Sequence, residues 1–95
     1  MSCSDKDLTD TQKGDLRDQG VQAARRWWEA NGSPRVDSIN DFDRSSADPA
    51  PYALEKLERF IDRTGADAER CRRSFRRHFR MTVDALVLTG ETCPQ

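Results

Sequence analysis

The segment from Arg70 to Arg80 constrains the fold more than any other part of the chain, because it holds six arginines and the only histidine. On a helical wheel at about 100° per residue, Cys71, Phe75 and Phe79 fall within one arc of about 100°, with His78 at its border. The arginines fall in the opposite arc, and they are Arg70, Arg72, Arg73, Arg76, Arg77 and Arg80. The pattern predicts an amphipathic helix with an apolar seam and an arginine-coated side, which we call the arginine face.

The arginine face is unfavourable for an isolated helix. Like charges three or four positions apart, such as Arg73 with Arg76 and Arg77, repel by about a few tenths of a kcal/mol per pair. We therefore expect an anion to lie against this face.

The charge of the chain is strongly segregated, although its net value is only −1 over 95 residues. Aspartates dominate the front of the chain, and residues 70–80 carry the positive excess. Between them lies an acidic connector around Arg44, with Asp37, Asp41, Asp43 and Asp48. Such asymmetry indicates binding partners rather than a fold, unless the acidic connector neutralises the arginine helix within the same molecule.

Local signals predict helices and no strands. A capping box at Thr9 and Gln12 starts a helix over residues 10–30, which should end at Asn31-Gly32. Val36, Ile39 and Phe42 are spaced for one short helical turn capped by Asp37 or Ser38, and residues 45–51 read as a loop.

Three further helices are expected after this loop. The first begins near residue 49 with Asp48 as its cap, and Gly65 ends it. The arginine helix opens at Ala66 or Asp67, with Glu69 in its first turn. Thr82 then caps a last short helix that Gly90 closes. We expect the apolar side chains of these helices to pack together: Leu54, Leu57, Phe60, Ile61, Phe75, Phe79, Leu86 and Val87.

The fold class is therefore all-α, with one small domain built as a bundle of about four helices. Flexible ends are expected at residues 1–8 and 91–95. The helical domain over residues 9–90 divides into an N-terminal helix with the acidic connector (9–48) and a C-terminal half (49–90).

Catalysis is not expected, because a chain of this length has no room for a large enclosed active site. His78 is the only near-neutral base, and neighbouring arginines should lower its pKa. The three cysteines have no CxxC spacing, so neither a disulfide framework nor a metal site is predicted, and Cys71 reads as a small buried hydrophobe. No cofactor is implied. No apolar run reaches membrane-spanning length, so we expect a cytoplasmic protein that does not bind membranes.

Trp27 and Trp28 form a second candidate contact. Adjacent helix positions point about 100° apart, so one ring should be buried and the other partly exposed, or both should straddle an interface. Trp and Arg are enriched at binding hot spots, and Arg25 and Arg26 precede the pair. The alternative is that both rings thicken a small core.

The segment 71–82 resembles the recognition helix and following turn of AraC-type helix-turn-helix regulators, including Ada-type DNA-repair regulators. Residues 54–60 would then stand where the family's first helix stands. Arg80 occupies the place of a glycine in the family's turn, and Val83 that of a proline. The resemblance implies a helix-turn-helix-like C-terminal half that contacts DNA.

Two functions are compatible with these observations. The first is a small non-catalytic regulator that binds nucleic acid, with the arginine face on phosphates and one or two arginines reaching base edges. The second is an adaptor or inhibitor, as in phage or mobile-element products, that occupies a larger protein or nucleoprotein complex. It would do so through the arginine face, through Trp27 or Trp28 with Arg25 and Arg26, or through Asp37, Asp41 and Asp43 as a phosphate mimic. A homodimer is a further possibility.

Overall fold

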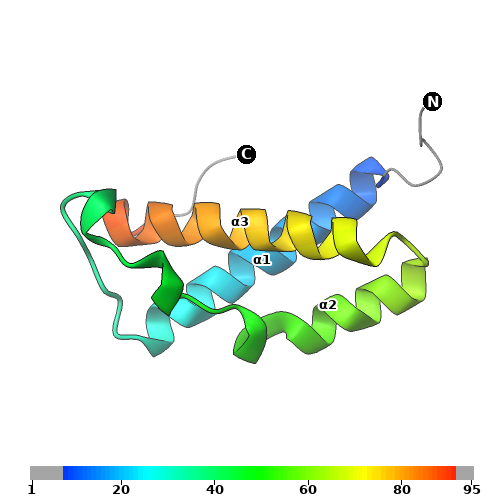
Figure 1. The fold of residues 1–95 in the computed structure, drawn as a ribbon, viewed down its shortest axis with the longest axis horizontal. Coiled ribbons are helices and arrows are strands. Elements are labelled where there is room, and N and C mark those ends of the chain that lie inside the picture. Colours follow the sequence, from blue (N-terminus) through cyan, green and yellow to red (C-terminus); the bar gives the residue numbers. More distant parts are fainter. Residues whose placement is uncertain (1–7, 92–95) are drawn as a thin grey trace.

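The computed structural model describes residues 8–91, with the side chains of residues 50–53 excepted, and this part of the chain is all-helical (Figure 1). It contains the helices α1 (Asp10–Ala30), α2 (Ala50–Thr64) and α3 (Ala68–Thr89), with two single turns of 3₁₀ helix, η2 (Ile39–Asp41) and η3 (Arg44–Ser46). Most of residues 1–8 and 91–95, where flexible ends were predicted, lie outside the described residues.

Helix α1 begins and ends where its local signals predict. The Thr9 hydroxyl accepts a hydrogen bond from the Gln12 backbone N–H, and the Gln12 side chain accepts one from the Thr9 N–H, both at 3.1 Å. This capping box satisfies two N–H groups that have no partner inside the helix. Asn31 is the C-cap, and Gly32 follows with φ 81°.

Helix α1 lies against α3 over much of its length, and the two cross in Figure 1. Leu16, Ala23, Ala24 and Trp27 are the buried hydrophobic residues of α1. Gly20 lies at the closest approach, because a Cβ there would stand 2.8 Å from the Phe75 carbonyl oxygen. The absence of a side chain at Gly20 therefore sets the distance between the two backbones.

The connector between α1 and α2 covers the C-terminal half of α3. The Val36 N–H donates to the Val87 carbonyl at 2.8 Å. The guanidinium of Arg44 binds the carboxylate of Asp84 through two nitrogens, at 3.0 and 2.9 Å. The predicted turn near Ile39 is confirmed as η2, capped by Ser38. The prediction of a plain loop over residues 45–51 is wrong at both ends, since η3 reaches residue 46 and α2 starts at residue 50.

Helix α2 is capped at its C-terminus by Gly65 in the left-handed region (φ 67°), as predicted. Its N-cap is Pro49 rather than Asp48. Leu57, Phe60 and Ile61 are buried, but Leu54 is 48% exposed, so its placement in the core is wrong. Periodicity marks the apolar face of a helix, but it does not show how far the neighbouring helices extend along that face.

The prediction of about four helices is wrong, because the arginine helix and the expected last helix form the single helix α3. Asp67 caps α3 by accepting a hydrogen bond from the Arg70 N–H at 3.0 Å, and Gly90 closes it with φ 83°. Thr82 is not a cap but a buried residue inside α3, 2% exposed. Thr82 and Val83 extend the apolar seam, so continuing the helix buries them together. No turn separates residues 80 and 83, where the helix-turn-helix resemblance implied one.

The core joins the three helices. Besides Leu54, the residues predicted for it are buried, and Val83 and Cys71 are buried with them. Cys71 has no exposed surface, in agreement with its reading as a small hydrophobe, and burial raises the pKa of its thiol.

Candidate functional site

All six arginines of the arginine face are exposed on α3. Helical spacing divides them into two rows. Arg70, Arg73 and Arg77 border α1, whereas the other row, Arg72, Arg76 and Arg80, lies on the side of α2 and η3. The two flanks of the helix therefore meet different neighbours.

The row beside α1 lines a cleft of about 560 Å³, which we call the basic cleft. Lys13 of α1 joins this row across the cleft. The other described residues that line it are Leu8, Ser74 and His78, so the described part of the cleft wall holds no carboxylate. Sequence reasoning missed Lys13, because nothing in its own helix indicates that the start of α1 lies against α3.

His78 is one of the residues that line the basic cleft and is half-buried, as its position at the border of the apolar seam predicted. Its pKa is lowered, first by burial and then by the charges of Arg77 and Arg17. Both causes favour the neutral imidazole, so the cleft holds its positive charge on arginine and lysine rather than on histidine.

The row on the other flank is partly engaged within the molecule. Arg72 binds Glu58 of α2 through two nitrogens, at 3.1 and 3.0 Å, and this contact raises the pKa of the guanidinium. Arg76 and Arg80 line a groove of about 240 Å³ together with Arg44 and Asp48. Asp48 is the acidic residue of that groove, so it neutralises this flank in part.

Few acidic groups oppose the arginine face. Arg73 pairs with Glu69 at 3.1 Å, but both side chains are highly exposed. Arg76, Arg77 and Arg80 make no ion pair within the described part of the chain. A substantial positive charge on α3 is therefore available to a partner.

The acidic connector does not neutralise the arginine face as a whole. Asp37 and Asp41 are exposed and form no ion pair within residues 8–91. Asp43 is exposed as well and caps η3, and its pKa is lowered by hydrogen bonds from the Ser45 hydroxyl and N–H. Arg44 of the connector pairs with Asp84 of α3, so in this contact the connector supplies the positive charge and α3 the negative charge.

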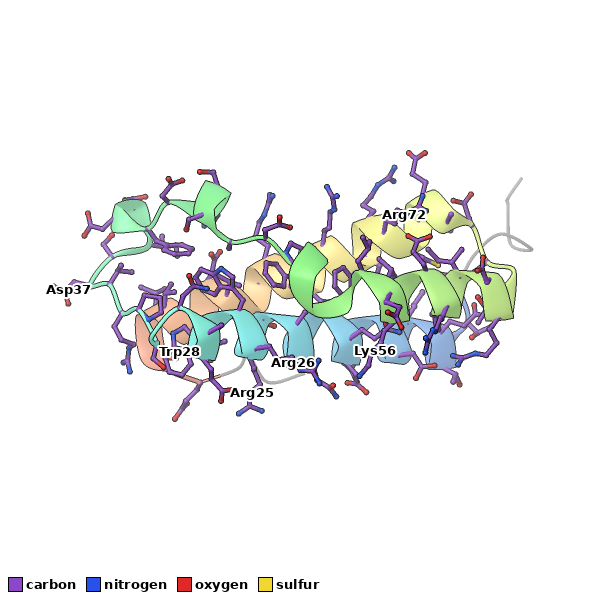
Figure 2. The ribbon with its side chains drawn as sticks, turned by 90° about the horizontal axis from the view of Figure 1, so that it is seen from below. Arg25, Arg26, Trp28, Asp37, Lys56 and Arg72 are labelled. Atoms are coloured by element: carbon purple, nitrogen blue, oxygen red, sulfur yellow. The ribbon has the colours of Figure 1, made fainter. Side chains whose placement is uncertain are left out.

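The tryptophan pair is divided between core and surface. Trp27 is 4% exposed and meets the Phe42 ring edge-to-face, with centroids 5.8 Å apart. Trp28 is half-buried, and its indole N–H donates to the Pro34 carbonyl at 3.1 Å. Arg25 and Arg26 are exposed, and Figure 2 shows them projecting from α1 on the side away from Arg72. The protein-interface candidates and the arginine face thus do not form one site.

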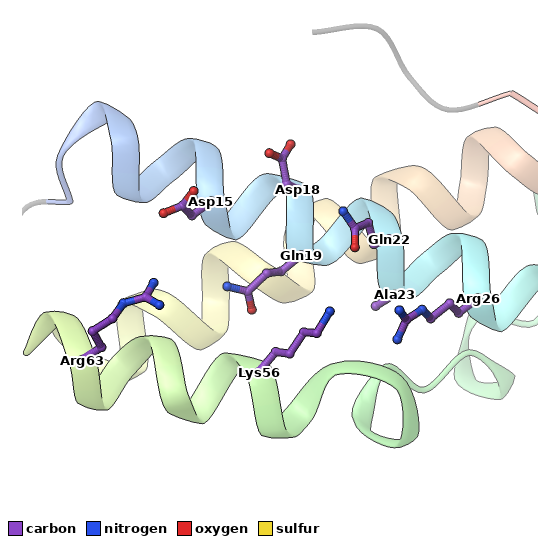
Figure 3. A pocket seen from close by; sticks show the side chains of 8 residues that line it. All are labelled: Asp15, Asp18, Gln19, Gln22, Ala23, Arg26, Lys56 and Arg63. Atoms are coloured by element: carbon purple, nitrogen blue, oxygen red, sulfur yellow. The ribbon is translucent and has the colours of Figure 1, made fainter.

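A second cleft, of about 280 Å³, lies between α1 and α2 (Figure 3). It is lined by charges of both signs, with Asp15, Asp18 and Arg26 from α1 and Lys56 and Arg63 from α2. The side-chain oxygen of Gln19 is buried there and has no hydrogen-bond partner among the described residues. The sequence alone does not reveal this cleft, because its walls depend on which faces of α1 and α2 meet.

The described residues include no group of three or more His, Cys, Asp or Glu side chains that could hold a metal ion. Among the described helices, none has the length and apolar character needed to cross a membrane. A scan of protein-family models, a search of curated proteins and a search of solved structures each give no match for this chain.

Proposed function

We propose that this protein is a non-catalytic regulator that binds the phosphate backbone of nucleic acid through the arginine face and the basic cleft. The observation that carries the proposal is the composition of the cleft wall. Lys13, Arg70, Arg73 and Arg77 converge on it from two helices, and none of the described residues that line it carries a carboxylate. Arginine binds phosphate with two parallel hydrogen bonds, so a row of exposed arginines suits a chain of phosphates.

The resemblance to AraC-type helix-turn-helix regulators supports the proposal through residues 71–80 only. Helices α2 and α3 are joined by residues 65–67, but they run close to antiparallel in Figures 1 and 2 rather than at the steep crossing angle of a helix-turn-helix unit. We propose no role for a turn after residue 80, since α3 continues there.

An adaptor that binds a larger protein complex through the exposed aspartates of the acidic connector is the second candidate. One observation favours it, namely that Asp37 and Asp41 stand exposed and without ion pairs in the described part of the chain, where a basic partner could reach them. Trp27 supplies no anchor for such a partner because it is buried.

The salt dependence of binding tests the nucleic-acid proposal. Binding to duplex DNA releases counterions, so the logarithm of affinity should fall with the logarithm of salt concentration by about 0.9 per neutralised phosphate. Replacing Arg73, Arg76 and Arg77 together by Ala should flatten this slope by about three units if each holds one phosphate. Adding Lys13→Ala should flatten it by about one further unit.

The matched control removes three positive charges from α2 instead, with Lys56, Arg59 and Arg63 changed to Ala. It should leave the slope close to that of the wild type. A folded Arg73/Arg76/Arg77 variant that binds DNA with the affinity and salt slope of the wild type would exclude the arginine face as the nucleic-acid site. Weak wild-type binding near physiological salt would favour the adaptor.

A further inference from the structure

The side of α1 that points away from α3 carries opposite charges in its two halves. On a helical wheel the charged residues of this side lie about 120–180° from Gly20, which contacts α3, and they are Asp15, Asp18, Arg25, Arg26 and Glu29. Asp15 and Asp18 occupy the N-terminal half of this side, and Arg25 and Arg26 occupy the C-terminal half. We call these four residues the α1 charge face.

The charges of this face make no close ion pair among the residues that the structure describes. All four side chains are exposed. Asp15, Arg25 and Arg26 form no ion pair within the described residues, and Asp18 has only a long contact of 3.9 Å with Arg17. Four charged groups are thus available for intermolecular contacts.

The positions along the helix axis make the α1 charge face complementary to itself. In two antiparallel copies related by a two-fold axis, each residue meets the residue that lies equally far on the other side of the axis. The midpoint between Asp18 and Arg25 and the midpoint between Asp15 and Arg26 differ by one residue, or about 1.5 Å along the axis. One axis near Val21 therefore brings both aspartates opposite arginines of the second copy.

The positions around the helix agree with this pairing. Asp15 and Arg26 lie within about 20° of each other on the wheel, and so do Asp18 and Arg25, while the two sets are at least about 60° apart. Figure 3 shows Asp18 pointing away from α2 and Arg26 lying toward it. A two-fold axis preserves this lateral position, so each aspartate meets the arginine on its own side of the face.

We propose that the α1 charge face binds a second copy of this chain, as an antiparallel dimer with four intermolecular ion pairs. Asp15 pairs with Arg26 of the second copy, and Asp18 pairs with Arg25 of the second copy. Lys56 and Arg63 of α2 flank the face and Glu29 lies at its C-terminal end, so charges of both signs meet across it. Because exposed ion pairs contribute little and are screened by salt, the dimer is weak and forms best at low ionic strength.

Two double variants with the same net charge test the pairing. Asp15→Arg with Arg26→Asp reverses one pair and keeps both attractive. Asp15→Arg with Arg25→Asp places Arg opposite Arg26 and Asp opposite Asp18, so both pairs become repulsive. Sedimentation equilibrium at low salt should show dimers for the wild type and the first variant. The dissociation constant of the second variant should be at least about tenfold higher than that of the first variant. High salt should shift the wild type toward monomer.

Mixing two further charge-reversed proteins provides a second measurement, which can be made even if either double variant fails to fold. The Asp15→Arg, Asp18→Arg protein and the Arg25→Glu, Arg26→Glu protein should each be monomeric alone and should form a one-to-one dimer when mixed. The proposal would be overturned if the wild type is monomeric at about 1 mM and low salt. It would also be overturned if the Asp15→Arg, Arg25→Asp variant dimerises as tightly as the wild type. The Arg73/Arg76/Arg77 variant should still dimerise, so this result is independent of nucleic-acid binding.

Discussion

Gly20 shows how a single residue can determine the packing of two helices. A Cβ at this position would lie 2.8 Å from the Phe75 carbonyl oxygen and 2.9 Å from both the His78 Cβ and the Phe79 nitrogen. Two of these atoms belong to the α3 backbone, which cannot move without shifting the helix. From sequence alone Gly20 only weakens α1, since the close approach depends on a residue more than fifty positions away.

Two glycine variants of α1 should therefore change stability in opposite directions. We expect Gly20→Ala to lower the free energy of unfolding by about 1–3 kcal/mol, because overpacking outweighs the gain in helix propensity. A Cβ added at Gly14 would have no neighbour within 4 Å in the described part of the chain, so Gly14→Ala should raise the free energy of unfolding by about 0.5–1 kcal/mol. Urea denaturation measures both, and equal effects of the two variants would contradict the close contact.

His78 should make stability depend on pH. Its pKa is lowered in the folded protein by burial and by Arg77 and Arg17, so the unfolded chain binds the proton more readily. The free energy of unfolding should then be highest above the unfolded pKa of about 6.5, and it should decrease as pH falls through that value toward the folded pKa. Urea unfolding at about pH 7.5 and 5.5 should show a smaller decrease for His78→Gln than for the wild type. Equal decreases in the two proteins would show that His78 titrates alike in both states.

At the scale of helices, signals that act within one turn were predicted well from the sequence. The capping box at Thr9, the C-caps Gly65 and Gly90, and the N-cap Asp67 are all observed. Thr82 carries the same kind of signal, yet it lies inside α3. A capping residue can stabilise a helix end, but it does not force the helix to end there. Burial of the apolar seam on both sides of Thr82 favours continuation of α3 through this position.

Leu54 and Leu57 lie on the same stripe of α2 but differ in burial, at 48% and 3% exposed. We expect Leu57→Ala to cost about 2–5 kcal/mol, because it leaves a cavity between α2 and the other helices. Leu54→Ala should cost less than about 0.5 kcal/mol. Denaturant unfolding of the two variants measures these changes in the free energy of unfolding. A large loss of stability for Leu54→Ala would mean that the packed part of α2 extends one turn further than described.

At the scale of the whole molecule, the arginine face was predicted from periodicity but its surroundings were not. The pattern of one helix shows which side chains share a face. It does not show that Lys13 completes one row or that Glu58 engages Arg72. Nor does it show that the acidic connector covers the C-terminal half of α3, where Asp48 lines a groove with Arg76 and Arg80. These features depend on tertiary contacts between distant segments, which no local pattern contains.

The positions of the two proposed surfaces lead to a last prediction, which rests on both proposals. The α1 charge face points away from α3, and the arginine face lies on the side of α3 away from the core. In the antiparallel dimer the two arginine faces therefore point in opposite directions. A straight duplex can contact only one of them, so a dimer should hold two separate duplexes.

A capture assay measures this bridging. An immobilised duplex of about 12 base pairs, close in length to the 43 Å long axis of one copy, is incubated with protein and then with a labelled duplex. The wild type and the Asp15→Arg, Arg26→Asp variant should retain the label at low salt. The Asp15→Arg, Arg25→Asp variant has the same net charge and arginine face, so it should bind the immobilised duplex but retain little label. Equal retention by the two variants would show that bridging, if it occurs, does not use the α1 charge face.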